Sequence, residues 1–227
     1  LSNKADQVDA IAQRILDTLF TSPRFQRLES AWRGLRLLLQ QSKADSSVHV
    51  QVACVHAETL GEDLEALAPH VIGNLPNVIL LDLPFDNSSV ASERLNVAAR
   101  WAATLMVPII AWGAVEFLQI PSWGDLGTLP FIPHHTETPA YAKFQKLRHS
   151  DEGHWLCLAC NRFLTRYPYG KENRPRDFPF NESDPLWIAP VWAVGALISQ
   201  SVAQCGWPTR FCERSRFQVQ DLALHSQ

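Results

Sequence analysis

The feature that most constrains the fold is a repeated switch in hydrophobic periodicity between residues 48 and 112. Strand-like apolar patterns occupy 48–54, 77–83 and 107–112, and helix-like spacing occupies 61–71 and 88–105. The run from Val78 to Leu81 is entirely apolar, which is typical of a strand buried on both faces. This β-α-β-α-β order predicts an α/β fold, with a layered, mostly parallel sheet flanked by helices.

The N-terminal segment carries the pattern of two amphipathic helices, one over 6–19 and one over 22–41. Ser22 and Pro23 are suited to the N-cap and the first position of the second helix. We expect the two helices to form a helical hairpin packed on the core. Residues 1–45 are then the hairpin and residues 46–227 the α/β domain, together one structural unit.

Regular patterns beyond residue 112 are separated by irregular stretches. The periodicity predicts a helix over 139–149, a strand over 154–160, and a last helix that begins at Pro185 and is ended by Gly206. The stretch 161–184 has no period and is longer than an ordinary connection, which favours a specific role for it.

Arginines and aromatic side chains alternate within 161–184. They are Arg162, Phe163, Arg166, Tyr167, Tyr169, Arg174, Arg176 and Phe178. Guanidinium groups and aromatic faces suit protein interfaces. The acids Glu172, Asp177, Glu182 and Asp184 in the same stretch argue against a phosphate partner. Two interpretations stay open: a partner interface, or internal salt bridges that hold a long loop on its own domain.

Composition narrows the class of protein. The chain has 46% hydrophobic and 19% charged residues, which excludes a disordered chain. A net charge of −3 gives no reason to expect a nucleic-acid partner, and no apolar run is long enough to cross a membrane. Five cysteines are an odd number for a disulfide framework, so we expect a reducing cytoplasm. The start at Leu1 without a signal-peptide pattern predicts a trimmed chain or a fragment.

Catalytic and metal-binding candidates are weak. Asp82 follows a buried strand, as magnesium-binding acids do, but no phosphate-binding glycine loop accompanies it, and an aspartate that starts a turn is the favoured interpretation. Cys157 and Cys160 would point to opposite faces of a strand, so we expect core cysteines and no metal or cofactor. The alternative hypothesis is a hydrolase or phosphate-handling α/β enzyme that uses Asp82, Asp86 and a histidine.

Three blocks resemble one known family. They are FQRLESAWRGL at 25–35, FQKLR with SDE at 144–152 leading to RFLTRYPYG at 162–170, and Trp187 with a helix ending in CGW at 205–207. Together they resemble the large contractile-sheath subunit of the bacterial type VI secretion system, the TssC/VipB family, also called ImpC/EvpB. In the second block Asn161 stands where the family has a proline. The blocks cover most of the chain, which therefore resembles a central core fragment or a divergent short relative.

The resemblance implies a mechanical role and no enzymatic activity. The protein would assemble in the bacterial cytoplasm with a small sheath subunit (TssB/VipA-like) and copies of itself around an inner tube protein, and contraction would drive secretion. A recycling AAA+ ATPase would grip an N-terminal segment that this chain lacks. The residues that the resemblance marks as interface or structural motif are Glu29, Trp32, Arg33, Arg148, Arg162, Phe163, Arg166 and Tyr169.

Overall fold

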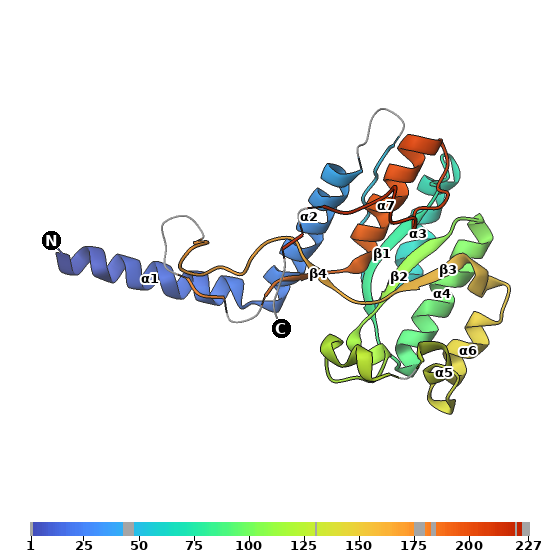
Figure 1. Ribbon diagram of the computed structural model, residues 1–227, viewed down its shortest axis with the longest axis horizontal. Coiled ribbons are helices and arrows are strands. Elements are labelled where there is room, and N and C mark those ends of the chain that lie inside the picture. Colours follow the sequence, from blue (N-terminus) through green and yellow to red (C-terminus); the bar gives the residue numbers. More distant parts are fainter. Residues whose placement is uncertain are drawn as a thin grey trace.

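The computed structural model describes residues 2–42, 48–129, 131–174, 180–182, 185–220 and 222–223. Two helices, α1 (Ser2–Phe20) and α2 (Pro23–Gln41), lead into an α/β body (Figure 1). The body contains α3 (Leu60–Ile72), β1 (Ile79–Phe85), α4 (Ser89–Leu105), β2 (Ile109–Gly113), α5 (Ile132–His135), α6 (Ala142–Arg148), β3 (Leu156–Ala159), β4 (Phe163–Leu164), β5 (Trp187–Ile188) and α7 (Pro190–Cys205). Arg176, Asp177, Phe178 and Asp184, named above from the sequence, lie outside the described residues.

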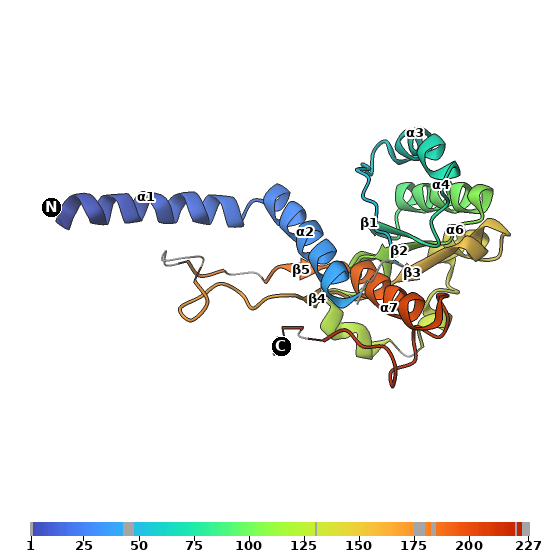
Figure 2. The ribbon, with the colours of Figure 1, turned by 90° about the horizontal axis from the view of Figure 1, so that it is seen from above.

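Three parallel strands form the centre of the body in the order β1-β2-β3. Ile79 of β1 is in register with Ile109 of β2, which is in register with Leu156 of β3. Helices α3 and α4 cover one face of this sheet, and α7 with α2 covers the other (Figure 2). The prediction of an α/β fold with a parallel sheet between helices is confirmed.

The sheet separates two hydrophobic clusters, because successive strand residues point to opposite faces. Leu81 and Ile109 pack with the small buried alanines of α4, whose size lets the helix lie close to the strands. Leu80 and Ile110 pack on the other side, in the cluster that contains Val191 of α7. Burial on both faces explains why β1 and β2 are almost continuously apolar.

The prediction of a strand over 48–54 is wrong. Residues 48–56 form no ladder in the part of the chain that the structure describes, and β1 is the first strand of the sheet. Val52 is 68% exposed and Val50 is also exposed, so the alternating valines meet neither a sheet nor a covering helix. A period of two shows that a segment can be a strand, but a strand also needs a neighbour to pair with.

The last helix begins later than the sequence pattern predicts. Trp187 and Ile188 pair antiparallel with β4, and α7 then starts at Pro190. Pro185 and Pro190 both suit a first helical position, and the pairing with β4 selects the second. The predicted end is confirmed, since Gly206 has a left-handed φ of 70° and its N–H donates to the Val202 carbonyl at 2.7 Å.

Both predicted N-terminal helices are present, but they diverge at Thr21 and Ser22 and do not lie side by side (Figure 2). The extended backbone of Ser22, with ψ at 119°, interrupts the helical path just before Pro23. Helix α2 packs on α7 through Leu37, Leu38 and Gly34, whereas α1 extends away from the sheet (Figure 1). The core contacts of this N-terminal segment are therefore those of α2.

Candidate interaction site

An ion-pair cluster joins α2 to the residues that follow β4. The Nη1 and Nη2 atoms of Arg166 donate to the Glu182 carboxylate at 2.6 and 2.8 Å, and its Nε donates to Glu29 of α2 at 3.1 Å. Arg33, one turn after Glu29 on α2, donates to the same Glu29 oxygen at 2.6 Å. The Arg166 and Glu182 side chains are 9% and 5% exposed, so this cluster is largely shielded from solvent.

The charges in the cluster balance, because two guanidinium groups face two carboxylates. Burial disfavours the charged form of Arg166, but the hydrogen bonds and charges of Glu182 and Glu29 outweigh burial and raise the pKa of Arg166 above its ordinary value. The two parallel bonds from Arg166 to Glu182 also restrict geometry, as bidentate pairs do. The cluster therefore joins two segments that are far apart in the sequence and fixes their relative orientation.

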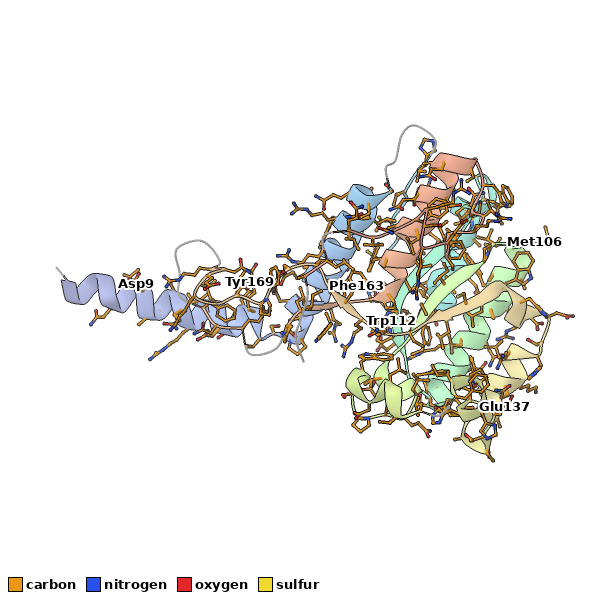
Figure 3. All side chains as sticks on the ribbon, viewed as in Figure 1. Asp9, Met106, Trp112, Glu137, Phe163 and Tyr169 are labelled. Carbon is orange, nitrogen blue, oxygen red and sulfur yellow. The ribbon has the colours of Figure 1, made fainter. Side chains whose placement is uncertain are left out.

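This link holds an arm, which we define as residues 165–174 and 180–182. Tyr169 of the arm donates its backbone N–H to Glu182 at 3.0 Å, and its ring lies 4.0 Å from the Arg166 guanidinium carbon. The Phe20 ring at the end of α1 lies 5.1 Å from the Tyr169 ring and 5.0 Å from that of Phe180. Figure 3 shows Tyr169 beside α1, well away from the α/β body. The arm and the α1–α2 junction thus support each other.

The other predicted residues lie elsewhere. Trp32 and Arg148 are exposed, on α2 and at the end of α6, and Arg148 forms no ion pair within the described ranges. Arg162 precedes β4 and lies 5.9 Å from the Trp187 ring centre, and burial lowers the pKa of its guanidinium. Phe163 is in β4, opposite Ile188. The structure brings together Glu29, Arg33, Arg166 and Tyr169, and leaves Trp32 and Arg148 facing outward.

The sequence does not identify which of the acids in 161–184 pairs with Arg166, and the structure shows that it is Glu182. Glu182 is 16 positions away, in a stretch with no periodicity, so no local spacing points to the pair. Besides the family resemblance, the spacing of Glu29 and Arg33, four positions apart on a helix, is a local signal for this cluster. The aromatic contacts of Phe20 with the arm were also unforeseen.

The candidate enzymatic residues have structural partners. Asp82 accepts hydrogen bonds from the indole nitrogens of Trp192 at 2.9 Å and Trp112 at 3.2 Å. Asp86 accepts the backbone N–H of Ser88, the residue that caps α4. Within the described residues, neither aspartate forms a hydrogen bond with a histidine, and no three His, Cys, Asp or Glu side chains form a group suited to a metal. The enzyme hypothesis is not supported.

All five cysteines are exposed free thiols, which corrects the prediction that Cys157 and Cys160 are core residues. Cys157 lies in the outer strand β3 and Cys160 follows it, so neither is enclosed between the layers. The apolar character of a cysteine does not decide whether its strand is central or at the edge.

The buried carboxyl group of Asp82 is expected to make the stability of the fold depend on pH. Burial raises the pKa of Asp82 above its ordinary value of 3.8, despite the opposing indole hydrogen bonds. The folded protein therefore holds the proton more tightly than the unfolded chain, so ionisation of Asp82 costs stability as pH rises from 3.8 through the raised pKa. Urea unfolding of the wild type and Asp82→Asn across this range should show the wild type losing stability relative to the variant as pH rises. A difference that is constant with pH, or that changes in the opposite direction, would contradict this assignment.

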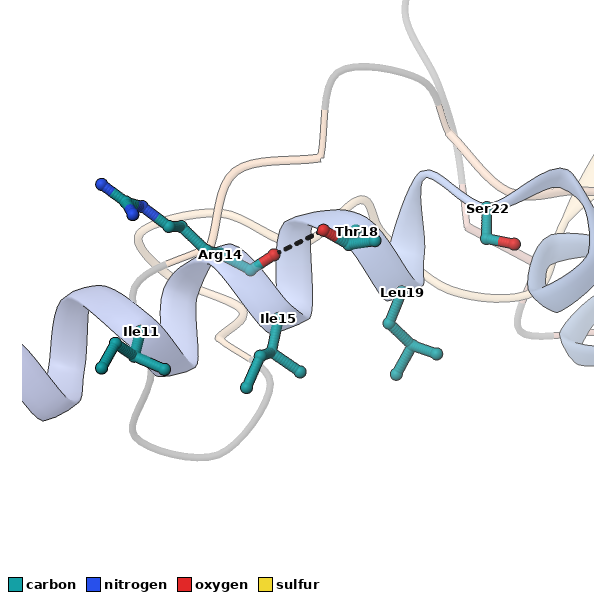
Figure 4. A pocket seen from close by; sticks show the side chains of 6 residues that line it. All are labelled: Ile11, Arg14, Ile15, Thr18, Leu19 and Ser22. Carbon is teal, nitrogen blue, oxygen red and sulfur yellow. Dashed lines mark hydrogen bonds between the residues drawn. The ribbon is translucent and has the colours of Figure 1, made fainter.

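The outward face of the N-terminal helices is apolar. Ile11, Ile15 and Leu19 project from one side of α1, where they line a shallow groove together with Arg14, Thr18 and Ser22 (Figure 4). On α2, Leu28, Trp32 and Leu39 are exposed. None of the helices described is both long and apolar enough to span a membrane.

Comparison with known proteins shows which family this chain resembles. The family model described as EvpB/VC_A0108, tail sheath N-terminal domain (VipB), matches residues 2–75 and 70–226. The type VI secretion system sheath protein TssC1 of Pseudomonas aeruginosa is 27% identical over an alignment that covers 89% of this chain and 46% of that relative. The chain thus spans less than half the length of this curated relative. Because the family model accounts for nearly all of the residues, the chain belongs to the VipB tail sheath family and corresponds to its N-terminal domain.

Proposed function

We propose that this protein is a structural subunit of a type VI secretion contractile sheath and that it turns over no substrate. Membership of the tail sheath family over nearly the whole chain carries the proposal. The similarity to a protein named as a type VI secretion sheath protein points to this assembly. In this role the chain assembles in the bacterial cytoplasm with a small sheath subunit, with copies of itself and with an inner tube, and a AAA+ ATPase recycles the contracted sheath.

The eight motif residues take two roles in this proposal. Glu29, Arg33, Arg166 and Tyr169 hold the arm on α2, so that a load applied to the arm reaches the α/β body through α2 and α7. Phe163 and Arg162 continue this path through β4 and the Trp187 strand. Trp32 and Arg148 face outward and serve as contacts for other subunits. Rigid, charge-balanced links suit a part that transmits force, because such links resist sliding of one element over another.

Co-expression with the small sheath subunit from the same genome tests the proposal. The chain is expected to co-purify with that subunit as a complex on size exclusion, because sheath subunits assemble through specific interfaces. The variant Arg148→Glu should weaken the complex without changing the circular dichroism spectrum, since Arg148 is exposed and has no ion pair in the described chain. A chain that stays monomeric beside a folded small subunit would contradict the proposal.

A further inference from the structure

Two glutamine side chains hold a short segment near the C-terminus. We call this segment the strap and define it as residues 217–220. Gln200 of α7 donates its Nε2 to the Gln218 carbonyl at 3.0 Å, and its Oε1 accepts the Gln218 N–H at 3.3 Å. Gln41, the last residue of α2, forms the same two bonds with Gln220, at 3.0 and 3.3 Å. Each carboxamide therefore pairs with the backbone of one strap residue, as a neighbouring strand would.

The spacing of the two pairs fits an extended chain. Residues two positions apart in a strand present their N–H and C=O groups to the same edge. Gln218 and Gln220 are two positions apart, and the backbone of both is bonded to the α2–α7 side. A further bond, from Gln200 Nε2 to the Gln41 carbonyl at 2.8 Å, joins the two glutamines of the helices to each other. Together these two side chains form one polar edge that matches an extended backbone.

Burial explains why this edge needs the strap. Gln200 is 4% exposed, so its carboxamide would be costly to leave without hydrogen-bond partners. Gln218 and Gln220 are themselves exposed, and they contribute only backbone atoms to the bonds with the two helices. The edge therefore recognises an extended main chain and not a particular side chain at either position. Phe217, which is 3% exposed, anchors the start of the strap.

The strap lies between the helices and the start of the arm. The chain that leaves α7 turns back across α7 towards α2 (Figure 1). Beyond the strap, Ala223 forms an antiparallel bridge with Leu164 of β4, two residues before Arg166. This path ties β4 to α2 and α7 without passing through the ion-pair cluster of Arg166.

We propose that Gln41 and Gln200 form a binding site for an extended polypeptide backbone, and that the strap is a releasable link closed by this site. Among the described residues, the backbone of 218–220 is bonded only to these two carboxamides. A segment held in this way opens at a lower free energy than the sheet and its covering helices. Opening of the strap frees β4 from the helices and leaves the arm attached through its ion-pair cluster. All of these contacts lie within this chain, so the proposal goes beyond the sheath function and does not depend on it.

Hydrogen exchange of the 227-residue chain, read by mass spectrometry, measures the opening. Gln41→Met keeps the length and helix propensity of the side chain and removes its carboxamide. Peptic fragments that contain 218–220 should exchange at least about tenfold faster in this variant, because two hydrogen bonds are lost. The fragment that contains β4 should also exchange faster. Fragments from β1 and α4 should keep the wild-type rate, since the strap opens locally.

Matched variants separate the two carboxamides from glutamines in general. Gln40→Met and Gln204→Met change exposed glutamines, one next to Gln41 and one a turn after Gln200, and both should leave strap exchange unchanged. Gln200→Met should accelerate strap exchange more than Gln41→Met does, because it also removes the bond to the Gln41 carbonyl. Wild-type strap exchange in both Gln41→Met and Gln200→Met would overturn the proposal. So would equal acceleration of the strap and α4 fragments in Gln41→Met, which would show that the strap does not open by itself.

Variants of the strap itself test recognition of the backbone. Gln218→Ala and Gln220→Ala remove exposed side chains and keep the backbone groups that bind the two carboxamides. Each should change strap exchange by less than about threefold, as surface substitutions do. A tenfold acceleration in either alanine variant, equal to that of Gln41→Met, would mean that the site recognises side chains and would contradict the proposal.

Discussion

Replacing Arg166 by methionine is expected to lower the free energy of unfolding by about 3–5 kcal/mol. The change leaves Glu29 and Glu182 facing each other in a largely buried cluster with only Arg33 to balance them. An uncompensated buried charge is costly because the interior does not solvate it as water does. Urea unfolding measures the loss, and tryptic cleavage in the arm, after Lys171, should become faster in the variant.

The matched control for this prediction is Arg174→Met. Arg174 is an exposed arginine of the same arm and, among the residues that the structure describes, donates only to the Lys171 carbonyl, at 3.2 Å. Its replacement should change stability by less than about 0.5 kcal/mol, as surface substitutions usually do. Arg166→Lys should fall between the two, since it keeps the charge and loses the bidentate geometry. Similar stabilities for Arg166→Met and Arg174→Met would show that the ion cluster does not hold the arm.

Gly34→Ala is the second substitution with a large expected effect. A Cβ atom at Gly34 would lie 2.3 Å from the Trp192 ring, which is closer than atoms can approach. Helix α2 must then move away from α7, or the indole must turn and lose its hydrogen bond to Asp82. We expect a net destabilisation of about 3 kcal/mol, because overpacking outweighs the gain of up to about 1 kcal/mol in helix propensity.

Gly73→Ala is the control for the glycine prediction. Gly73 follows α3 with a φ of −71°, and nothing lies within 4 Å of a Cβ built there. Thermal unfolding should show little change for Gly73→Ala and a clear drop in melting temperature for Gly34→Ala. A stabilised Gly34→Ala variant would mean that α2 does not pack closely on Trp192.

Local residue patterns predict the buried strands of the fold, whereas they do not predict the segments at its edges. The apolar run at Val78–Leu81 predicts a strand buried on both faces, and β1 confirms it, because only a covered strand can be apolar on both sides. The segment 48–54 has an equally good alternation but no strand beside it. Likewise, two prolines suited the start of the last helix, and the pairing of Trp187 with Leu164 selected the later one. These outcomes depend on neighbours that a local pattern does not contain.

Only part of the candidate site could be predicted from the sequence, again because its contacts join distant segments. The resemblance to the sheath family marked Glu29, Arg33, Arg166 and Tyr169, and the structure brings these four together. The resemblance did not mark Glu182, which completes the cluster and lies at the other end of the arm, in a stretch without periodicity. The sequence left two interpretations open for the arginines of the arm. Internal salt bridges are the one that applies to Arg166. Whether Trp32 and Arg148 contact a partner stays a prediction.

The central claim is that this chain is a part of a larger assembly. Electron microscopy of the chain co-expressed with the small sheath subunit and the inner tube protein tests it most directly. We expect particles in which this α/β body repeats around and along the tube. Free tubes beside unassembled monomers of this chain would contradict it.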